Sequence, residues 1–249
     1  MFGCSPSAGL RTFGSGAGLS GRFVARTAGP AVGFPPGTAW RLHQCPARRR
    51  GASLRRHRYD GGVNERVKNP WQRKSRRLAY ENPWLQLYHD EVVRPDGQPG
   101  IYGVVHFRHR AVGVVPLDTE RDLVLLAGQF RYTLDRYSWE IPEGGGRFDE
   151  APEEAARREL AEETGYAGGT WRELCRCDLS DSVTDETAVL FVAMDLVAGA
   201  ATPEGTEEIE VRWVAFDDAL AMIARGEITD AMTIIGLQAV ALERKANRG

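Results

Sequence analysis

The pattern of hydrophobic and polar positions predicts that ordered structure begins near residue 69. Residues 84–93 alternate between apolar and polar side chains, which is typical of a half-buried strand, and residues 101–106 resume this alternation. Pro95-Asp96-Gly97 lies between them as a turn signal, so the two segments predict an antiparallel hairpin. Residues 1–58 contain short apolar stretches without a helical or strand period, and we expect no packed core there.

The rest of the chain mixes strands and helices. A helix is predicted over residues 151–164, with Asp149 and Pro152 at its start and Gly165 at its end. Apolar or alternating segments predict strands at residues 111–117, 122–127, 171–178, 188–196 and 208–215, and the last part of the chain predicts helices at 216–224 and 229–245. Because strands and helices do not alternate strictly, an α+β fold is favoured over a doubly wound one.

Composition excludes several classes of protein. The 249 residues are 42% hydrophobic and 27% charged, which is enough for a buried core. No stretch of 18 apolar residues is present, so we expect no membrane partner. The net charge of −2 hides an asymmetry: residues 1–58 hold ten arginines and no acid, which leaves 22 basic against 34 acidic side chains, a net charge of −12, in the remainder.

The arginine-rich beginning of the chain allows three hypotheses. It is a targeting segment, a nucleic-acid-binding arm that uses Arg48-Arg49-Arg50 and Arg55-Arg56, or a disordered extension. We favour a disordered extension over residues 1–66. An early uninterrupted apolar run is missing, which argues against a secretory signal.

The four cysteines indicate neither a zinc site nor a disulfide framework. Cys175 and Cys177 form a single C-x-C without a second pair, and Cys4 and Cys45 lie in the basic segment. We expect free thiols and therefore a cytoplasmic location.

The segment with the most chemical information is a predicted glycine-rich loop, Gly144-Gly145-Gly146, that leads into the acidic helix. Glu159 and Glu163 are four residues apart on one face of that helix, and Glu162 lies on its flank. Like charges at this spacing repel each other unless a cation lies between them, and carboxylates without a nearby Cys or His suit Mg²⁺ or Mn²⁺. Such a site favours phosphate chemistry. Glu153 and Glu154 fit the alternative, a solvated helix face.

The spacing of this segment resembles the signature of the Nudix hydrolase family, G-x5-E-x7-R-E-U-x-E-E-x-G-U, in which U is a bulky apolar residue. Its seven identities are Gly144, Glu150, Arg158, Glu159, Glu162, Glu163 and Gly165. At average residue frequencies they arise by chance about once in 10⁸ to 10⁹ starting points. The resemblance implies Mg²⁺-dependent cleavage of a nucleoside diphosphate linked to a second group. It also implies a mixed β-sheet sandwiched between helices.

The resemblance also assigns roles within the motif. Glu159 and Glu163 would be the principal metal ligands, and Glu162 a further ligand or a group that orients water. The backbone carbonyl of Glu143 would complete the metal shell. Arg158 would hold the carboxylates in place, with Glu150 in support.

Segments upstream of the motif resemble the ADP-ribose pyrophosphatase branch of the family. They are Gly128-Gln129-Phe130-Arg131 and Trp139-Glu140-Ile141-Pro142-Glu143-Gly144. Arg131 would bind the diphosphate, with an ordinary surface arginine as the alternative. Glu140 would be a substrate contact or a buried partner.

Downstream, residues 179–186 resemble the loop that brings a late glutamate to the metal or the attacking water. Glu186 is our candidate, with a solvated loop acid as the alternative. Asp181-Ser182 stand where the branch has Pro-Gly.

The N-terminal hairpin also resembles this branch, where such a segment forms a homodimer. We therefore expect a β subdomain over residues 67–110 that dimerises and a Nudix hydrolase domain over 111–247. Trp84 and Tyr88 would stack on a base, or belong to the core or the dimer interface.

Together these observations predict a Mg²⁺-dependent pyrophosphatase, with Mn²⁺ as a substitute, whose partner is a small nucleotide sugar and not nucleic acid. The favoured reaction converts ADP-ribose to AMP and ribose 5-phosphate. The alternatives are hydrolysis of GDP-mannose, NADH or another dinucleotide, and a non-catalytic nucleotide sensor. A sensor tends to lose the acidic motif residues, which are all present here.

Overall fold

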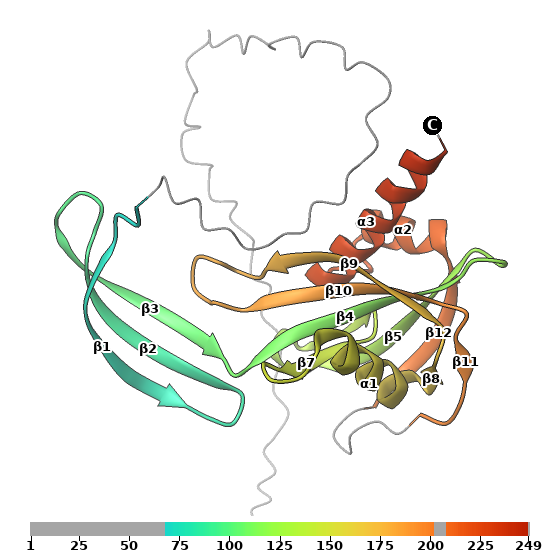
Figure 1. The fold of residues 1–249 in the computed structure, drawn as a ribbon, viewed down its shortest axis with the longest axis horizontal. Helices are drawn as coiled ribbons and strands as arrows, with labels where there is room; N and C mark the ends of the chain where they lie inside the picture. Colours follow the sequence, from blue (N-terminus) through green and yellow to red (C-terminus); the bar gives the residue numbers. More distant parts are fainter. Residues whose placement is uncertain (1–67, 202–207, 249) are drawn as a thin grey trace, which may run out of the picture. The chain divides into compact units, whose positions relative to one another are not determined.

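The computed structural model describes residues 68–201 and 208–248, and the predicted extension, with Cys4 and Cys45, lies outside this range. The described chain begins with a three-stranded antiparallel sheet of β1 (Gln72–Glu81), β2 (Leu85–Val93) and β3 (Pro99–Phe107), in the order β1-β2-β3 (Figure 1). The predicted hairpin is confirmed as β2 and β3. Strand β1 was not predicted, because all ten of its residues are exposed and it carries no apolar alternation.

A larger mixed sheet of seven strands follows. Its main path runs β12-β5-β4-β10-β9, with β6 paired to β5 and β7 paired to β4. Strands β4 and β10 are parallel, and the other pairs are antiparallel. The bounds are β4 (His109–Asp118), β5 (Leu123–Arg131), β6 (Arg136–Glu140), β7 (Glu143–Arg147), β9 (Thr170–Asp178), β10 (Thr187–Met194) and β12 (Glu210–Ala215).

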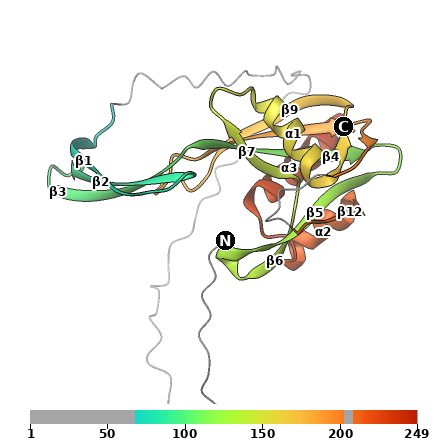
Figure 2. The same cartoon turned by 90° about the horizontal axis from the view of Figure 1, so that it is seen from below.

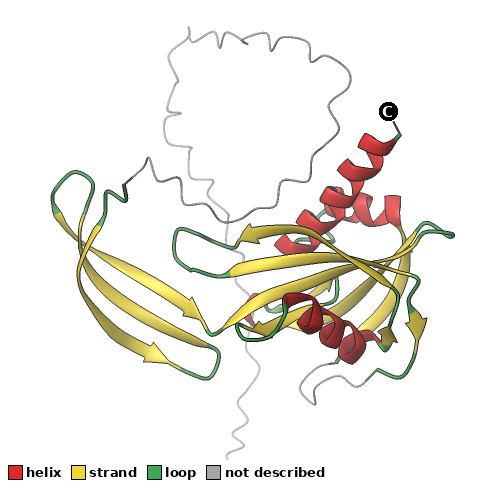
Figure 3. Ribbon diagram, in the orientation of Figure 1, coloured by secondary structure: helices red, strands yellow, loops and turns green. Residues whose placement is uncertain are grey.

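Three helices cover this sheet: α1 (Pro152–Thr164), α2 (Phe216–Arg225) and α3 (Ala231–Asn247) (Figure 3). Alternate residues of β4 pack to opposite sides. Val112 and Val114 join a core with Leu160 of α1, whereas Val115 and Leu117 join the core that contains α2 and α3. A sheet buried on both faces explains the continuous apolar runs in the sequence and confirms the expected sandwich. Among the described helices none is long and apolar enough to cross a membrane.

Short elements complete the fold. A 3₁₀ turn, Tyr132–Leu134, follows β5, and a two-stranded sheet pairs β8 (Tyr166–Ala167) with β11 (Val197–Ala198). The predicted thiols Cys175 and Cys177 lie in β9 and are free. Burial raises the pKa of Cys175 to about 11, so this thiol stays protonated near neutral pH.

Helix α1 begins and ends near the predicted residues. Pro152 occupies the first turn, and the negative charges of Glu153 and Glu154 face the positive end of the helix dipole. The residue before the helix, Ala151, makes no side-chain cap. Gly165 ends the helix at φ 74°, a left-handed conformation that glycine adopts without strain.

The glycine-rich segment before α1 is a strand and not the loop that the sequence suggested. Strand β7 pairs with β4, and Gly144 is opposite Val112. Glycine is needed because α1 packs directly against this strand: a Cβ at Gly146 would lie 2.7 Å from the Cβ of Ala155. A strand without side chains lets the helix approach the sheet closely.

Replacement of this glycine tests the close approach. We expect Gly146→Ala to lower the free energy of unfolding by about 1 to 3 kcal/mol, because the added methyl group forces α1 away from β7. The measurement is urea unfolding followed by circular dichroism. Gly145→Ala is the matched control, because its Cβ would meet only an ordinary contact at 3.5 Å from His109. Equal stability of the two variants would contradict this account.

Candidate active site

A cleft of about 730 Å³ lies between β7, α1 and the turn that joins β1 to β2. Seven of the predicted residues line it: Trp84, Arg131, Glu143, Glu150, Arg158, Glu159 and Glu163. His109 and Arg147 also line it, and they reach the cleft through the pairing of β4 with β7, which no local sequence pattern indicates. Asp149, predicted at the start of the helix, lines the cleft as well and pairs with Arg147 at 2.7 Å.

Arg158 joins three groups at the mouth of the cleft. Its Nη1 donates to Glu159 at 2.8 Å and to Glu162 at 3.0 Å, and its Nη2 donates to the carbonyl of Gly145 at 3.0 Å. Its Nε lies 3.6 Å from Glu150. One guanidinium group therefore fixes two carboxylates relative to β7, and charge-assisted hydrogen bonds of this kind are stronger than neutral ones.

Glu159 lies directly against Gly144. A Cβ at Gly144 would overlap the carboxylate group of Glu159, so the first glycine of the motif leaves room for that carboxylate. This contact links two motif positions that are far apart along the chain.

Glu163 is buried, and its Oε2 accepts a hydrogen bond of 3.3 Å from the backbone N–H of Glu143. Glu162 is one residue away, is partly exposed and does not line the cleft. The helix therefore points Glu159 and Glu163 into the cleft and leaves Glu162 on the flank, as the spacing predicts.

Arg131 faces the cleft from the end of β5 and is held by two acids. Its Nε donates to both carboxylate oxygens of Glu140 at 3.0 Å, and its Nη2 lies 3.3 Å from Glu143. Burial by itself lowers the pKa of Arg131, but its hydrogen bonds to Glu140 and the nearby negative charges more than offset this. Glu140 is only 2% exposed, so its carboxylate meets Arg131 and has little access to the cleft.

A second group of acids lies beside this pair. Carboxylate oxygens of Glu140, Glu143 and Asp230 all lie within 4.8 Å of one another. Asp230 caps α3 by accepting from the N–H of Thr233 at 2.7 Å, and no pattern in the sequence indicates that it approaches Glu143. Burial, followed by the charges of Asp230 and Glu140, raises the pKa of Glu143 well above its usual value.

These groups fit a hard divalent cation. The Oε2 atom of Glu143 is buried and has no hydrogen-bond partner among the described residues. A carboxylate oxygen in that state is destabilising unless a proton or a cation reaches it. The candidate ligand atoms in this group and on α1 are all carboxylate oxygens, which suit Mg²⁺ or Mn²⁺ better than a softer metal. Glu140, Glu143 and Asp230 have carboxylate oxygens close enough together to hold such an ion, and Glu143 lines the cleft with Glu159 and Glu163. The sequence pointed to the backbone carbonyl of Glu143, whereas the unpartnered atom is in its side chain.

The remaining predicted residues lie at the edge of this arrangement. Trp84 lines the cleft with 66% of its surface exposed. Tyr88 does not line it, and Arg76 stacks on its ring at 4.6 Å. Glu186 also lies outside the lining, in the loop between β9 and β10, and burial followed by the charge of Asp185 raises its pKa.

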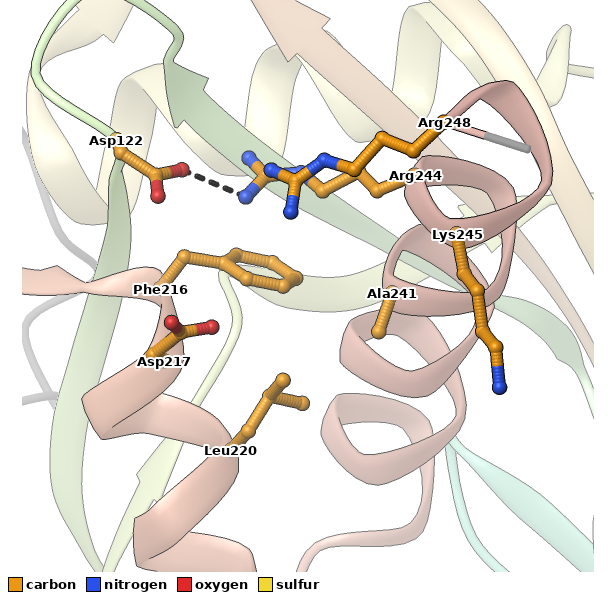
Figure 4. Close-up of a pocket in the computed structure, with 8 residues that line it drawn as sticks. All are labelled: Asp122, Phe216, Asp217, Leu220, Ala241, Arg244, Lys245 and Arg248. Carbon is orange, nitrogen blue, oxygen red and sulfur yellow. Dashed lines mark hydrogen bonds and ion pairs between the residues drawn. The ribbon is translucent and has the colours of Figure 1, made fainter.

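Another cavity, of about 460 Å³, lies between α2 and α3 (Figure 4). Arg244 stacks on the ring of Phe216 and pairs with Asp122 at 2.6 Å. None of the predicted site residues lines this cavity, so the chemistry of the motif belongs to the first cleft.

Comparison with known proteins agrees with this geometry. Residues 107–232 match the NUDIX domain model, which covers half of the chain. The chain belongs to the Nudix family. Residues 71–105 match the model of the nucleoside diphosphate sugar hydrolase N-terminal domain, so the three-stranded sheet that precedes the Nudix domain also has a counterpart in known proteins.

Relatives of this Nudix hydrolase act on several substrates. It is 31% identical to a CMP-5'-(N-acetyl-N-hydroxy-3-aminopropyl)phosphonate hydrolase of Streptomyces rubellomurinus over 68% of this chain and 82% of the relative. It is also 31% identical to the ADP-ribose pyrophosphatase of Bacillus subtilis, over 64% and 86%. GDP-mannose pyrophosphatases match as well.

A solved ADP compounds hydrolase shares the fold of this Nudix hydrolase. The TM-score is 0.66 at 17% identity, and the alignment covers 73% of this chain and 97% of the other. The likeness confirms the Nudix fold.

The contact between Glu159 and Gly144 yields a prediction about metal binding. In Gly144→Ala the new methyl group displaces the Glu159 carboxylate, and we expect the affinity for Mn²⁺ to fall about tenfold. Electron paramagnetic resonance of free Mn²⁺ measures this. Gly145→Ala, which leaves the carboxylate in place, is expected to bind Mn²⁺ like the wild type. An unchanged affinity in Gly144→Ala would remove Glu159 from the metal site.

Proposed function

We propose that this Nudix hydrolase is a Mg²⁺-dependent pyrophosphatase of nucleoside diphosphate sugars, with ADP-ribose as its preferred substrate. One observation carries the proposal: Arg131 and the acidic groups Glu143, Glu159 and Glu163 line the same cleft. A diphosphate needs both positive charge and oxygen ligands for its metal ion, and this cleft offers the two side by side. The ADP-ribose pyrophosphatases among the relatives support the choice of substrate.

Each group has a part in the proposed reaction. When bound, Mg²⁺ neutralises the diphosphate and activates water. The oxygen of a water molecule attacks one phosphorus, and the bond from that phosphorus to the bridging oxygen breaks. AMP and ribose 5-phosphate leave, and Glu186 accepts the proton of the water, with Glu162 as the alternative acceptor. Arg158 keeps the carboxylates of α1 in position.

Arg131 acts as a fixed cation in this scheme. Because Glu140 and Glu143 already hold its guanidinium group, no side-chain ordering is required when the substrate binds. The same two acids reduce its net attraction for an anion, so the metal ion must supply most of the positive charge. Trp84, exposed at the rim of the cleft, offers an aromatic face to the base of the nucleotide.

GDP-mannose is the second candidate substrate, because GDP-mannose pyrophosphatases also match this chain. A stacking contact by Trp84 accepts any purine, so adenine and guanine are not distinguished by that residue. NADH and other dinucleotides share the diphosphate and remain further candidates.

A substrate panel tests the proposal directly. Phosphomonoester products are measured with ADP-ribose, GDP-mannose, NADH and diadenosine polyphosphates, with Mg²⁺ and then with EDTA. We expect the highest kcat/KM for ADP-ribose and loss of activity in EDTA. If no compound is hydrolysed above background, the non-catalytic sensor is the better hypothesis.

Glu163→Gln tests the metal assignment with the best substrate of that panel. The amide keeps a group that accepts from the N–H of Glu143, but it removes the charge. We expect kcat to fall about a thousandfold or more while circular dichroism stays unchanged. Glu153→Gln, on the exposed face where Glu153 pairs with Arg157, is the matched control and retains activity. Wild-type turnover in Glu163→Gln would exclude Glu163 as a metal ligand.

We also propose a role for each of the two domains. We assign residues 67–110 to a dimerisation subdomain and 111–247 to the hydrolase domain. Apolar side chains exposed on the three-stranded sheet, among them Leu78, Tyr80 and Ile101, support a homodimer. The cytoplasmic location stays a prediction.

Light scattering after size exclusion tests the dimer. We expect the wild type to be a dimer and Ile101→Asp to shift it toward the monomer, because a charge replaces an apolar side chain that is 71% exposed in one copy. Val197→Asp is the control: Val197 is 68% exposed but lies in β11, outside this sheet. A monomeric wild type would contradict the proposal.

A further inference from the structure

The loop that joins β9 to β10 is bound along the edge of β3, which belongs to the N-terminal sheet (Figure 2). The N–H of Val105 donates to the carbonyl of Val183 at 2.9 Å, and the N–H of Asp185 donates to the carbonyl of Val105 at 3.3 Å. Val105 and Thr184 form a parallel bridge. The loop therefore extends the three-stranded sheet by a short additional segment.

Side chains of β3 strengthen this attachment. The hydroxyl of Tyr102 donates to the carbonyl of Ser182 at 2.8 Å. The Nδ1 atom of His106 lies 2.6 Å from Oδ2 of Asp185, and the other oxygen of Asp185 accepts from the N–H of Phe107 at 3.4 Å. Both oxygens of the Asp185 carboxylate are therefore bound to β3, one by His106 and the other by the backbone of Phe107.

The side chains of His106 and Asp185 are 37% and 51% exposed, and pairs between exposed side chains contribute little to the stability of a fold. What the pair does define is the path of the backbone beside it.

Glu186 follows Asp185 directly. Its N–H donates to the hydroxyl of Thr184 at 3.0 Å, and its carbonyl accepts from the N–H of Leu179 at 2.9 Å. Two residues later, Ala188 pairs with Ala111 of β4. His109, which lines the cleft, lies two residues before Ala111 on this neighbouring strand.

The loop is held both by its own hydrogen bonds and by β3. The N–H groups of Val183 and Thr184 both donate to the carbonyl of Ser180, at 2.9 and 3.1 Å, and Ser180 has a left-handed φ of 51°. These bonds shape the turn, and the contacts with β3 attach that turn to the N-terminal sheet.

We propose that His106 and Asp185 are positioning residues for hydrolysis, and that β3 fixes the backbone at Glu186 through them. This inference rests on the catalytic role proposed above for Glu186. The N-terminal sheet then serves the reaction of its own chain, independently of any dimer contact.

Steady-state kinetics of variants at His106 and Asp185 test the inference. His106→Ala and Asp185→Ala are expected to lower kcat about tenfold and to leave KM within about twofold, because the loop loses its direction while the cleft stays intact. His106→Asn places an amide nitrogen near the position of Nδ1 and is expected to restore most of the lost kcat. His89→Ala, in β2, is the matched control and is expected to behave like the wild type. An unchanged kcat in His106→Ala would overturn the inference.

A double variant separates positioning from a general loss of structure. Glu186→Gln lowers kcat by itself, and adding His106→Ala is expected to cause no further loss, since both changes remove the same group from the reaction. If His106→Ala lowers kcat by the same factor in both backgrounds, it acts on something other than Glu186, and the inference is wrong.

Hydrogen exchange supplies a measurement that does not depend on activity. The amide of Asp185, which donates to Val105, is expected to exchange about tenfold faster in His106→Ala than in the wild type or His89→Ala. Unchanged exchange overturns the inference even if the enzyme is active. If exchange rises but Glu186→Gln retains full activity, Glu186 has no part in the reaction and the positioning role fails, whereas the proposed function fails only if the substrate panel shows no hydrolysis.

Discussion

The structure of the cleft depends on how closely the acidic helix α1 approaches strand β7. Three consecutive glycines remove side chains from the strand, and the Glu159 carboxylate occupies space beside Gly144 that a methyl group would otherwise fill. Arg158 then joins the helix to the strand through the carbonyl of Gly145. The repulsion between carboxylates is offset by this arginine and by the backbone N–H donated to Glu163.

The cleft carries more acidic than basic side chains. Three arginines and five carboxylates line it, and one oxygen of Glu143 is buried without a partner among the described residues. An anionic substrate would be repelled by this surface alone. The electrostatics of the cleft therefore favour a divalent cation, in agreement with the family, because such a cation would change the sign of the local field.

The N-terminal sheet contributes to the cleft although it precedes the Nudix domain. The turn between β1 and β2 supplies Trp84, whose backbone carbonyl accepts from the N–H of Arg108 at 2.9 Å. The edge of β3 binds the loop that carries Glu186. Backbone hydrogen bonds thus join the N-terminal sheet to the hydrolase domain near the cleft.

Features that depend on local spacing can be predicted from the sequence. Helical periodicity places Glu159 and Glu163 on one face, and apolar runs specify the two-sided core of β4 and β10, because both patterns repeat within a few residues. The folded chain was needed to show that the glycines form a strand, that exposed β1 joins the sheet and that Asp230 lies beside Glu143. These contacts join segments distant along the chain, so the pairing of strands, and not local preference, determines them.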